Sequence, residues 1–181
     1  MRHSNTELLI DYWQARKVGR QSPLRSSIDP SEITELLPQV FILGRTAPGQ
    51  FVFRLAGALL TRLHARDLRR LDFASLFTAA DRQAITTTLE TARRAAEPAV
   101  LSIEARAEEG LSAQLEILLA PLRAPTLPPD RVLGLYQLLT PLAGLRDKPV
   151  RELRVAGLDA AAGGPGLPVL RLAALDGRRI A

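Results

Sequence analysis

Three strand-like segments follow one another late in the chain, and they constrain the fold more than any other feature. They span residues 99–107, 112–122 and 131–139, with turn-forming residues between them. In the middle segment Leu115, Ile117 and Leu119 alternate with other side chains, and a period of two indicates a β-strand. Consecutive strands usually pair as neighbours. The sequence therefore predicts three antiparallel strands in this region.

An earlier pair of strand-like segments flanks a short turn. Residues 40–44 form a nearly continuous apolar run, which suits a strand buried on both faces. Residues 51–56 follow after Pro48 and Gly49, and a Pro-Gly pair favours a turn with one negative and one positive φ. We therefore expect a β-hairpin over residues 40–56.

Helical spacing characterises the segments around these strands. Residues 6–19 carry the apolar stripe of an amphipathic helix, with Ser4, Asn5 or Thr6 as the expected cap and Gly19 as its end. Asp29 and Pro30 indicate the start of a short helix. Short helices are expected over residues 57–77. The longest helix is expected over residues 81–96, capped by Thr78 or Asp81 and ended by Pro98.

The chain changes in composition after Pro141. Residues 142–181 are rich in Ala, Gly and Pro, most clearly at residues 160–166. Residues 150–155 and 167–175 keep enough Leu and Val to dock on a folded domain. We therefore expect one domain over residues 1–141, followed by a tail that is partly docked or disordered.

Composition excludes several chemistries. The chain has no Cys and two His, which rules out disulfides, thiolate metal sites, cysteine nucleophiles and a site of three histidines. It contains no Gly-x-Ser-x-Gly elbow, phosphate-binding Gly-rich loop or His-Glu-x-x-His motif. No apolar run approaches the roughly 20 residues of a spanning helix, and no signal peptide is evident. We expect a cytoplasmic protein without a membrane anchor, a metal or catalytic residues.

The formal charge of +5 comes from arginines scattered along the whole chain. The densest basic group is Arg62, His64, Arg66, Arg69 and Arg70. Such a group can hold a phosphate or a nucleotide. However, acidic residues interrupt it and no aromatic residues are interleaved for stacking on bases. We expect a solvated surface and no nucleic-acid partner.

Six short motifs recur together in the order of one family. They are Tyr12-Trp13, Ile28-Asp29-Pro30, Leu37-Pro38 with Val40-Phe41-Ile42-Leu43, Phe53-Arg54-Leu55-Ala56-Gly57, Arg66-Asp67-Leu68, and Leu118-Leu119-Ala120-Pro121-Leu122. From about Glu7 to Leu139 the chain resembles a bacterial family of short, stand-alone PAS-like proteins of unassigned function. It departs from the family pattern at His64-Ala65, Arg70 and Phe77. The resemblance implies an α+β fold: a five-stranded antiparallel sheet with short helices and an N-terminal amphipathic helix.

The resemblance also implies a site. PAS domains hold small ligands between the sheet and the helices that correspond here to residues 59–77 and 81–96. The expected ligand is small and apolar or aromatic. The candidate contacts are Arg54, His64, Arg66, Asp67, Phe73 and Phe77. Two of these have structural alternatives: Arg54 as an ion-pair partner of Asp67 or Asp72, and His64 as a surface or partly buried histidine rather than a haem ligand. The sequence does not identify a cofactor.

The leading hypothesis is a sensory or regulatory domain without catalytic output, which binds a small ligand or signals through protein association. The alternatives are an interaction module with a filled core and, with less support, a small α+β enzyme. A homodimer or another protein is the expected partner. The stripe of Leu8, Leu9, Tyr12 and Trp13 is assigned either to that interface or to packing on the chain's own sheet.

Overall fold

The computed structural model describes residues 2–125 and 130–160. In this part of the chain an antiparallel sheet of six strands has the order β2-β1-β5-β4-β3-β6. The strands are β1 Val40–Ala47, β2 Gln50–Ala56, β3 Ala99–Arg106, β4 Ser112–Leu122, β5 Arg131–Leu138 and β6 Glu152–Ala160. The α-helices are α1 Ser4–Ala15, α2 Ala58–His64 and α3 Arg82–Ala95. The 3-10 helices are η1 Arg25–Ser27, η2 Pro30–Gln39, η3 Phe73–Leu76, η4 Glu108–Gly110 and η5 Leu142–Leu145.

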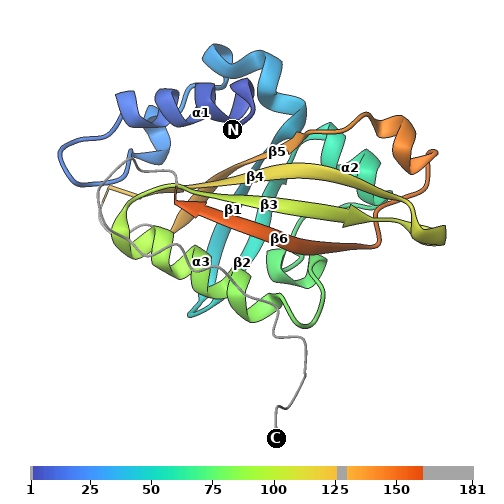
Figure 1. Cartoon of the computed structure of the whole chain (residues 1–181). Helices are drawn as coiled ribbons and strands as arrows, with labels where there is room; N and C mark the ends of the chain where they lie inside the picture. Colours follow the sequence, from blue (N-terminus) through green and yellow to red (C-terminus); the bar gives the residue numbers. More distant parts are fainter. Residues whose placement is uncertain (1, 126–129, 161–181) are drawn as a thin grey trace, which may run out of the picture.

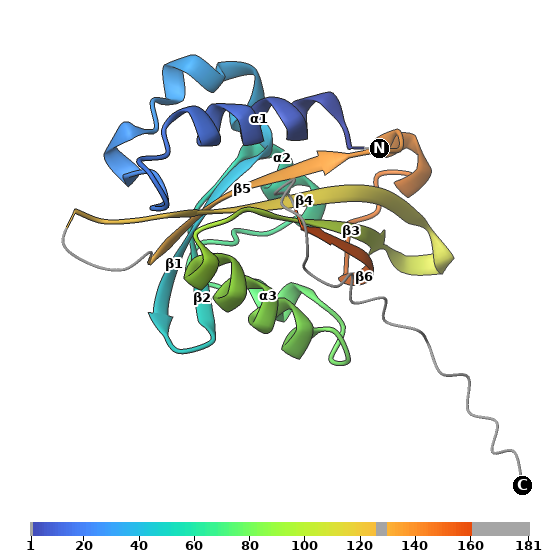
Figure 2. The ribbon, with the colours of Figure 1, turned by 60° about the vertical axis from the view of Figure 1, so that its left-hand side comes forward.

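The sheet carries a hydrophobic core on each face. Helix α1 lies over one face and α3 over the other (Figure 1 and Figure 2). The core under α1 includes Leu9, Trp13 and Ile42, whereas α2, η3 and α3 pack on the opposite core around Phe41 and Leu43. Successive residues of β1 thus point into different cores. This explains why the run at residues 40–44 is apolar without interruption.

The predicted α+β class is confirmed, but the sheet has six strands instead of five. The additional strand, β6, pairs antiparallel with β3 along its whole length. Leu153 of β6 is fully buried in the core and accepts a hydrogen bond from the Thr78 backbone N at 2.9 Å. The folded part of the chain therefore continues past residue 141. Residues 167–175, also expected to dock, lie outside the described residues.

Two helix caps differ from those expected. Helix α1 is capped by His3, whose Nδ1 accepts from the Asn5 backbone N at 3.1 Å, and it ends at Ala15, well before Gly19. Asp81 occupies the cap position of α3, but its carboxylate makes no capping bond. It accepts instead from the Val155 backbone N at 3.0 Å and from Thr78 Oγ1 at 2.8 Å. Asp81 thus ties α3 to β6.

Gly134 of β5 leaves room for an aromatic ring. An added Cβ would lie 2.0–2.4 Å from three ring atoms of Phe41, its cross-strand partner. That ring also contacts the rings of Phe53 and Phe73, with centroids at 5.6 and 5.4 Å, so it cannot shift without displacing them. We expect Gly134→Ala to lower the free energy of unfolding by about 2 kcal/mol in urea titrations. The control is Gly144→Ala, where the nearest atom would be 3.5 Å away; an equal loss in both variants would contradict the clash.

Candidate functional site

The residues predicted as ligand contacts separate into three places. His64, Phe73 and Phe77 are buried in the core between the sheet and α2, η3 and α3. Arg66 and Asp67 are exposed after the end of α2. Arg54 is exposed on β2. The structure therefore does not bring the six residues together in one site.

Aromatic rings pack against one another in the region where the ligand was expected. Phe73 lies at the centre, with ring centroids at 5.4 Å from Phe41, 5.6 Å from Phe53 and 5.3 Å from Phe77. All four side chains have at most 1% of their surface exposed. Stacked and edge-to-face contacts at such distances are favourable beyond the burial of area. We call these four rings the aromatic cluster.

His64 and Tyr136 form a polar pair in the same core. The distance from His64 Nε2 to the Tyr136 hydroxyl is 3.1 Å, and both side chains are buried. His64 Nδ1 is also buried and makes no hydrogen bond of normal geometry. Burial, and secondly the charge of Arg66, lower the pKa of His64 to about 4, while the Val150 backbone acts in the opposite direction. His64 is therefore a neutral imidazole at pH 7.

This arrangement does not fit an axial haem ligand or a metal site. An iron ligand needs a free ring nitrogen facing space for the macrocycle. Here Nε2 is hydrogen-bonded to Tyr136. Nδ1 has no such partner, but it is buried in the same core as Phe41, Phe73 and Leu60. Among the described residues no group of three His, Asp or Glu side chains is placed to hold a metal ion.

The ion pair proposed for Arg54 is wrong in both of its forms. Asp67 pairs with Arg69, with Nη2 and Oδ2 at 2.6 Å, and this hydrogen-bonded cation lowers the pKa of Asp67 to about 2. The Asp72 carboxylate caps η3 by accepting from the Ala74 backbone N. A partner two residues away in the chain satisfies each acid at a smaller entropic cost than a partner on another strand.

Arg54 instead lines a groove on the face of the sheet that carries α1. The groove is formed by Arg25, Ile42, Arg54, Leu55 and Arg131, and its volume is about 400 Å³. We call it the arginine groove. Between the pairs Ile42–Leu55 and Leu43–Phe53 the register shifts at Arg54, which is therefore the extra residue of a β-bulge. Arg25 and Arg131 were missed from the sequence. Arg131 meets Arg54 only through the strand register, and Arg25 is placed by the contact of η1 with the end of β4, where its backbone N donates to the Arg123 carbonyl at 2.9 Å.

Two of the four residues assigned to a dimer interface are buried in the chain's own core and cannot contact a partner. Leu9 and Trp13 are fully buried against the sheet, and Trp13 Nε1 donates to the Pro121 carbonyl at 2.8 Å. Leu8 is 52% exposed and Tyr12 is half-buried. Thus only Leu8 and part of Tyr12 face away from the core.

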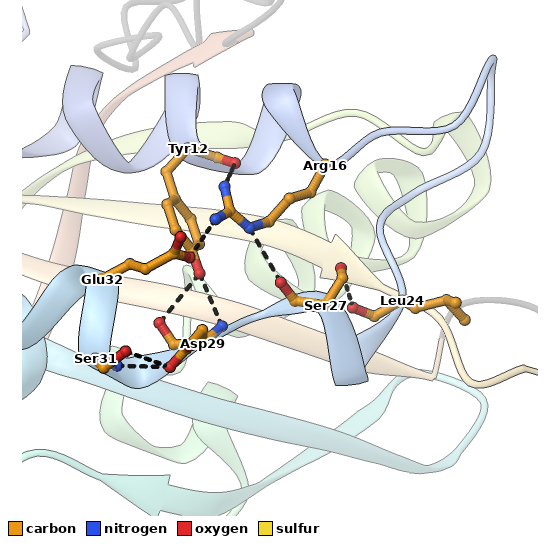
Figure 3. A network of polar contacts seen from close by, with 7 residues as sticks. All are labelled: Tyr12, Arg16, Leu24, Ser27, Asp29, Ser31 and Glu32. Carbon is orange, nitrogen blue, oxygen red and sulfur yellow. Dashed lines mark hydrogen bonds and ion pairs between the residues drawn. The ribbon is translucent and has the colours of Figure 1, made fainter.

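Tyr12 and Arg16 connect α1 to the start of η2 and to the residues just before it (Figure 3). The Tyr12 hydroxyl donates to the Asp29 carbonyl at 3.1 Å and accepts from the Asp29 backbone N at 2.8 Å. The Arg16 guanidinium lies 3.6 Å over the Tyr12 ring and pairs with Glu32. Arg16 Nε also donates to the Ser27 carbonyl at 3.0 Å. These contacts hold α1 and residues 27–32 together as one layer.

The first turn of α1 is held by buried polar groups of the sheet. The carboxylate of Glu116 on β4 accepts from the His3 backbone N at 3.1 and 3.3 Å. Asn5 Nδ2 donates to Gln137 Oε1 on β5 at 2.9 Å.

In the described part of the chain, no helix is long and apolar enough to span a membrane.

A family model that matches most of the chain identifies its family. No curated protein matches the chain. A LOV protein of Rhodobacter sphaeroides is similar with 11% identity and a TM-score of 0.47, covering 65% of this chain and 72% of that one. A PAS domain from Colwellia psychrerythraea has 13% identity and a TM-score of 0.46, covering 61% of this chain and 96% of that one. The family model described as PAS domain matches residues 1–137, more than half of the sequence. The chain therefore belongs to the PAS domain family of sensory domains.

Proposed function

We propose that this chain is a regulatory PAS domain with a filled interior, which receives and passes on its signal at its surface and has no catalytic output. The aromatic cluster is the observation that carries this proposal. Its four rings, together with His64 and Tyr136, occupy the region between the sheet and the helices where a ligand would otherwise lie. The interaction module is therefore favoured over a sensor with an internal apolar ligand.

Two further observations support the proposal. His64 and Tyr136 are buried and bonded to each other, so they are closed to a substrate. The exposed side of α1, with Leu8 and the outer edge of Tyr12, is the part of the predicted dimer face that stays accessible. A second copy or another protein is the partner that this surface would take.

Native mass spectrometry and an apolar probe test this function. We expect the freshly purified full chain to carry no extra non-covalent mass, and the same spectrum reports its oligomeric state. Benzene should leave the thermal midpoint of the wild type unchanged. It should raise that of Phe73→Ala, since an apolar cavity binds benzene and binding to the native state alone stabilises it.

Two outcomes would overturn a filled interior. One is a bound mass that is lost on denaturation; the other is stabilisation of the wild type by benzene as strong as that of Phe73→Ala. Phe73→Leu is the matched control, because it opens a smaller cavity and should respond less. The mass spectrum of the wild type gives its result even where the alanine variant is too unstable to purify.

A further inference from the structure

We propose that the arginine groove binds the phosphate groups of a small soluble compound with two adjacent phosphates. This inference deepens the proposed function and rests on it, because it names the chemistry of a signal received at the surface. Three cationic side chains from separate parts of the chain converge there: Arg25 of η1, Arg54 of β2 and Arg131 of β5.

The convergence of two guanidinium groups is built into the sheet. Arg131 is the cross-strand partner of Gly44 on β1. A Cβ on Gly44 would lie 2.4 Å from Arg131 Nη1 and 2.6 Å from Arg54 Nε. Both side chains therefore lie over the bare backbone of Gly44. The bulge in β2 adds Arg54 at this point, and bulges commonly aim a side chain toward a site.

What distinguishes the groove is that arginines without a carboxylate partner lie together in it; other described arginines without such a partner, such as Arg94, occur elsewhere on the surface. Arg16, Arg45, Arg69, Arg93, Arg106 and Arg151 each pair with a carboxylate. Among residues 2–125 and 130–160, no ion pair involves Arg25, Arg54 or Arg131, and no lining residue is acidic. Arg54 and Arg131 bring like charges within about 5 Å of each other, and their repulsion is relieved by a shared anion.

The shape and lining of the groove favour a small phosphate compound. Guanidinium groups bind phosphate oxygens through paired hydrogen bonds, and several forks together suit adjacent phosphates. A volume of about 400 Å³ is that of a small-molecule site. Ile42 and Leu55 supply an apolar wall for the rest of the compound. The lining has no aromatic ring on which the bases of a single-stranded nucleic acid would stack.

Calorimetric titration of the full chain with inorganic pyrophosphate, at physiological ionic strength, tests the site. We expect binding of one pyrophosphate per chain. Arg54→Gln and Arg131→Gln should each weaken it by about tenfold or more, because each removes charge-assisted hydrogen bonds. Arg94→Gln is the matched control: Arg94 is exposed on α3, on the opposite side of the sheet, and its loss should change the affinity by less than about twofold.

Gly44→Ala is a steric test that removes no charge. Its methyl group would displace the ends of the Arg54 and Arg131 side chains, which can swing into solvent. We expect the fold to be kept, with a thermal midpoint within about 3 °C of the wild type. The affinity for pyrophosphate should fall by about tenfold.

Each contrary result has a defined meaning. The phosphate site is overturned if the wild type shows no stoichiometric binding, or if Arg94→Gln weakens binding as much as Arg54→Gln. Binding to vesicles containing phosphatidic acid, or to a short single-stranded RNA, without binding to free pyrophosphate would overturn the assignment of a soluble compound. None of these results changes the benzene and mass-spectrometric tests of the filled interior, so the two proposals fail separately.

Discussion

Replacing Phe73 by alanine is expected to lower the free energy of unfolding by about 3–5 kcal/mol. The ring is fully buried and contacts the rings of Phe41, Phe53 and Phe77. Its removal takes away transfer free energy and leaves a cavity that the three remaining rings can only partly close. Urea titration measures the loss, with the fluorescence of Trp13 in the other core as reporter.

Two controls make this prediction specific. Phe73→Leu keeps most of the buried volume, so its loss should be clearly smaller than that of the alanine variant. Leu139→Ala removes a leucine that is 45% exposed, and its effect should stay within about 0.5 kcal/mol. A loss below about 1 kcal/mol for Phe73→Ala would contradict a tightly packed cluster.

Acidification is expected to destabilise the protein by roughly 3 kcal/mol through His64 alone, between pH 6.5 and pH 4. In the unfolded chain this imidazole takes up a proton near its ordinary pKa of 6.5, whereas burial lowers its pKa in the folded protein to about 4. Within this window the unfolded state binds more protons, so the free energy of unfolding falls as the pH falls. Above pH 6.5 the contribution is fully present.

His64→Gln isolates this contribution. The amide can still bond to the Tyr136 hydroxyl but does not titrate. Urea titrations at several pH values should show the slope between pH 6.5 and pH 4 reduced in the variant, whereas other acid-dependent losses stay the same. Parallel curves for the wild type and the variant would contradict the prediction, because they would mean that His64 has the same pKa in the folded and the unfolded state.

The strands were predictable where the pattern was local. The hairpin of β1 and β2 and the bounds of β3, β4 and β5 agree with the expected segments within about two residues. Strand β6 was missed although Leu153 and Val155 alternate. A register shift opposite Ser102 and Ile103 breaks its alternation, and the Ala- and Gly-rich residues that follow gave the whole region the composition of a tail.

The candidate site was less predictable, because it depends on contacts between distant residues. The sequence singled out Arg54 but not Arg131, which meets it only through the pairing of β1 with β5. Gly44 matters because the side chains of Arg54 and Arg131 lie over it. A glycine in an apolar run does not indicate such neighbours. Phe73 and Phe77 were expected to surround a ligand, and they contact each other.

The strand order also determines when the chain can fold during synthesis. The hairpin of β1 and β2 closes a turn of a few residues, but its attachment to the rest of the sheet is the pairing of β1 with β5, some ninety residues later. Native contacts of such long range slow folding. While the ribosome makes α3, β3 and β4, the edge of β1 that will receive β5 is without its partner. The nascent hairpin is therefore exposed to wrong pairing and to chaperones until residues 131–138 emerge.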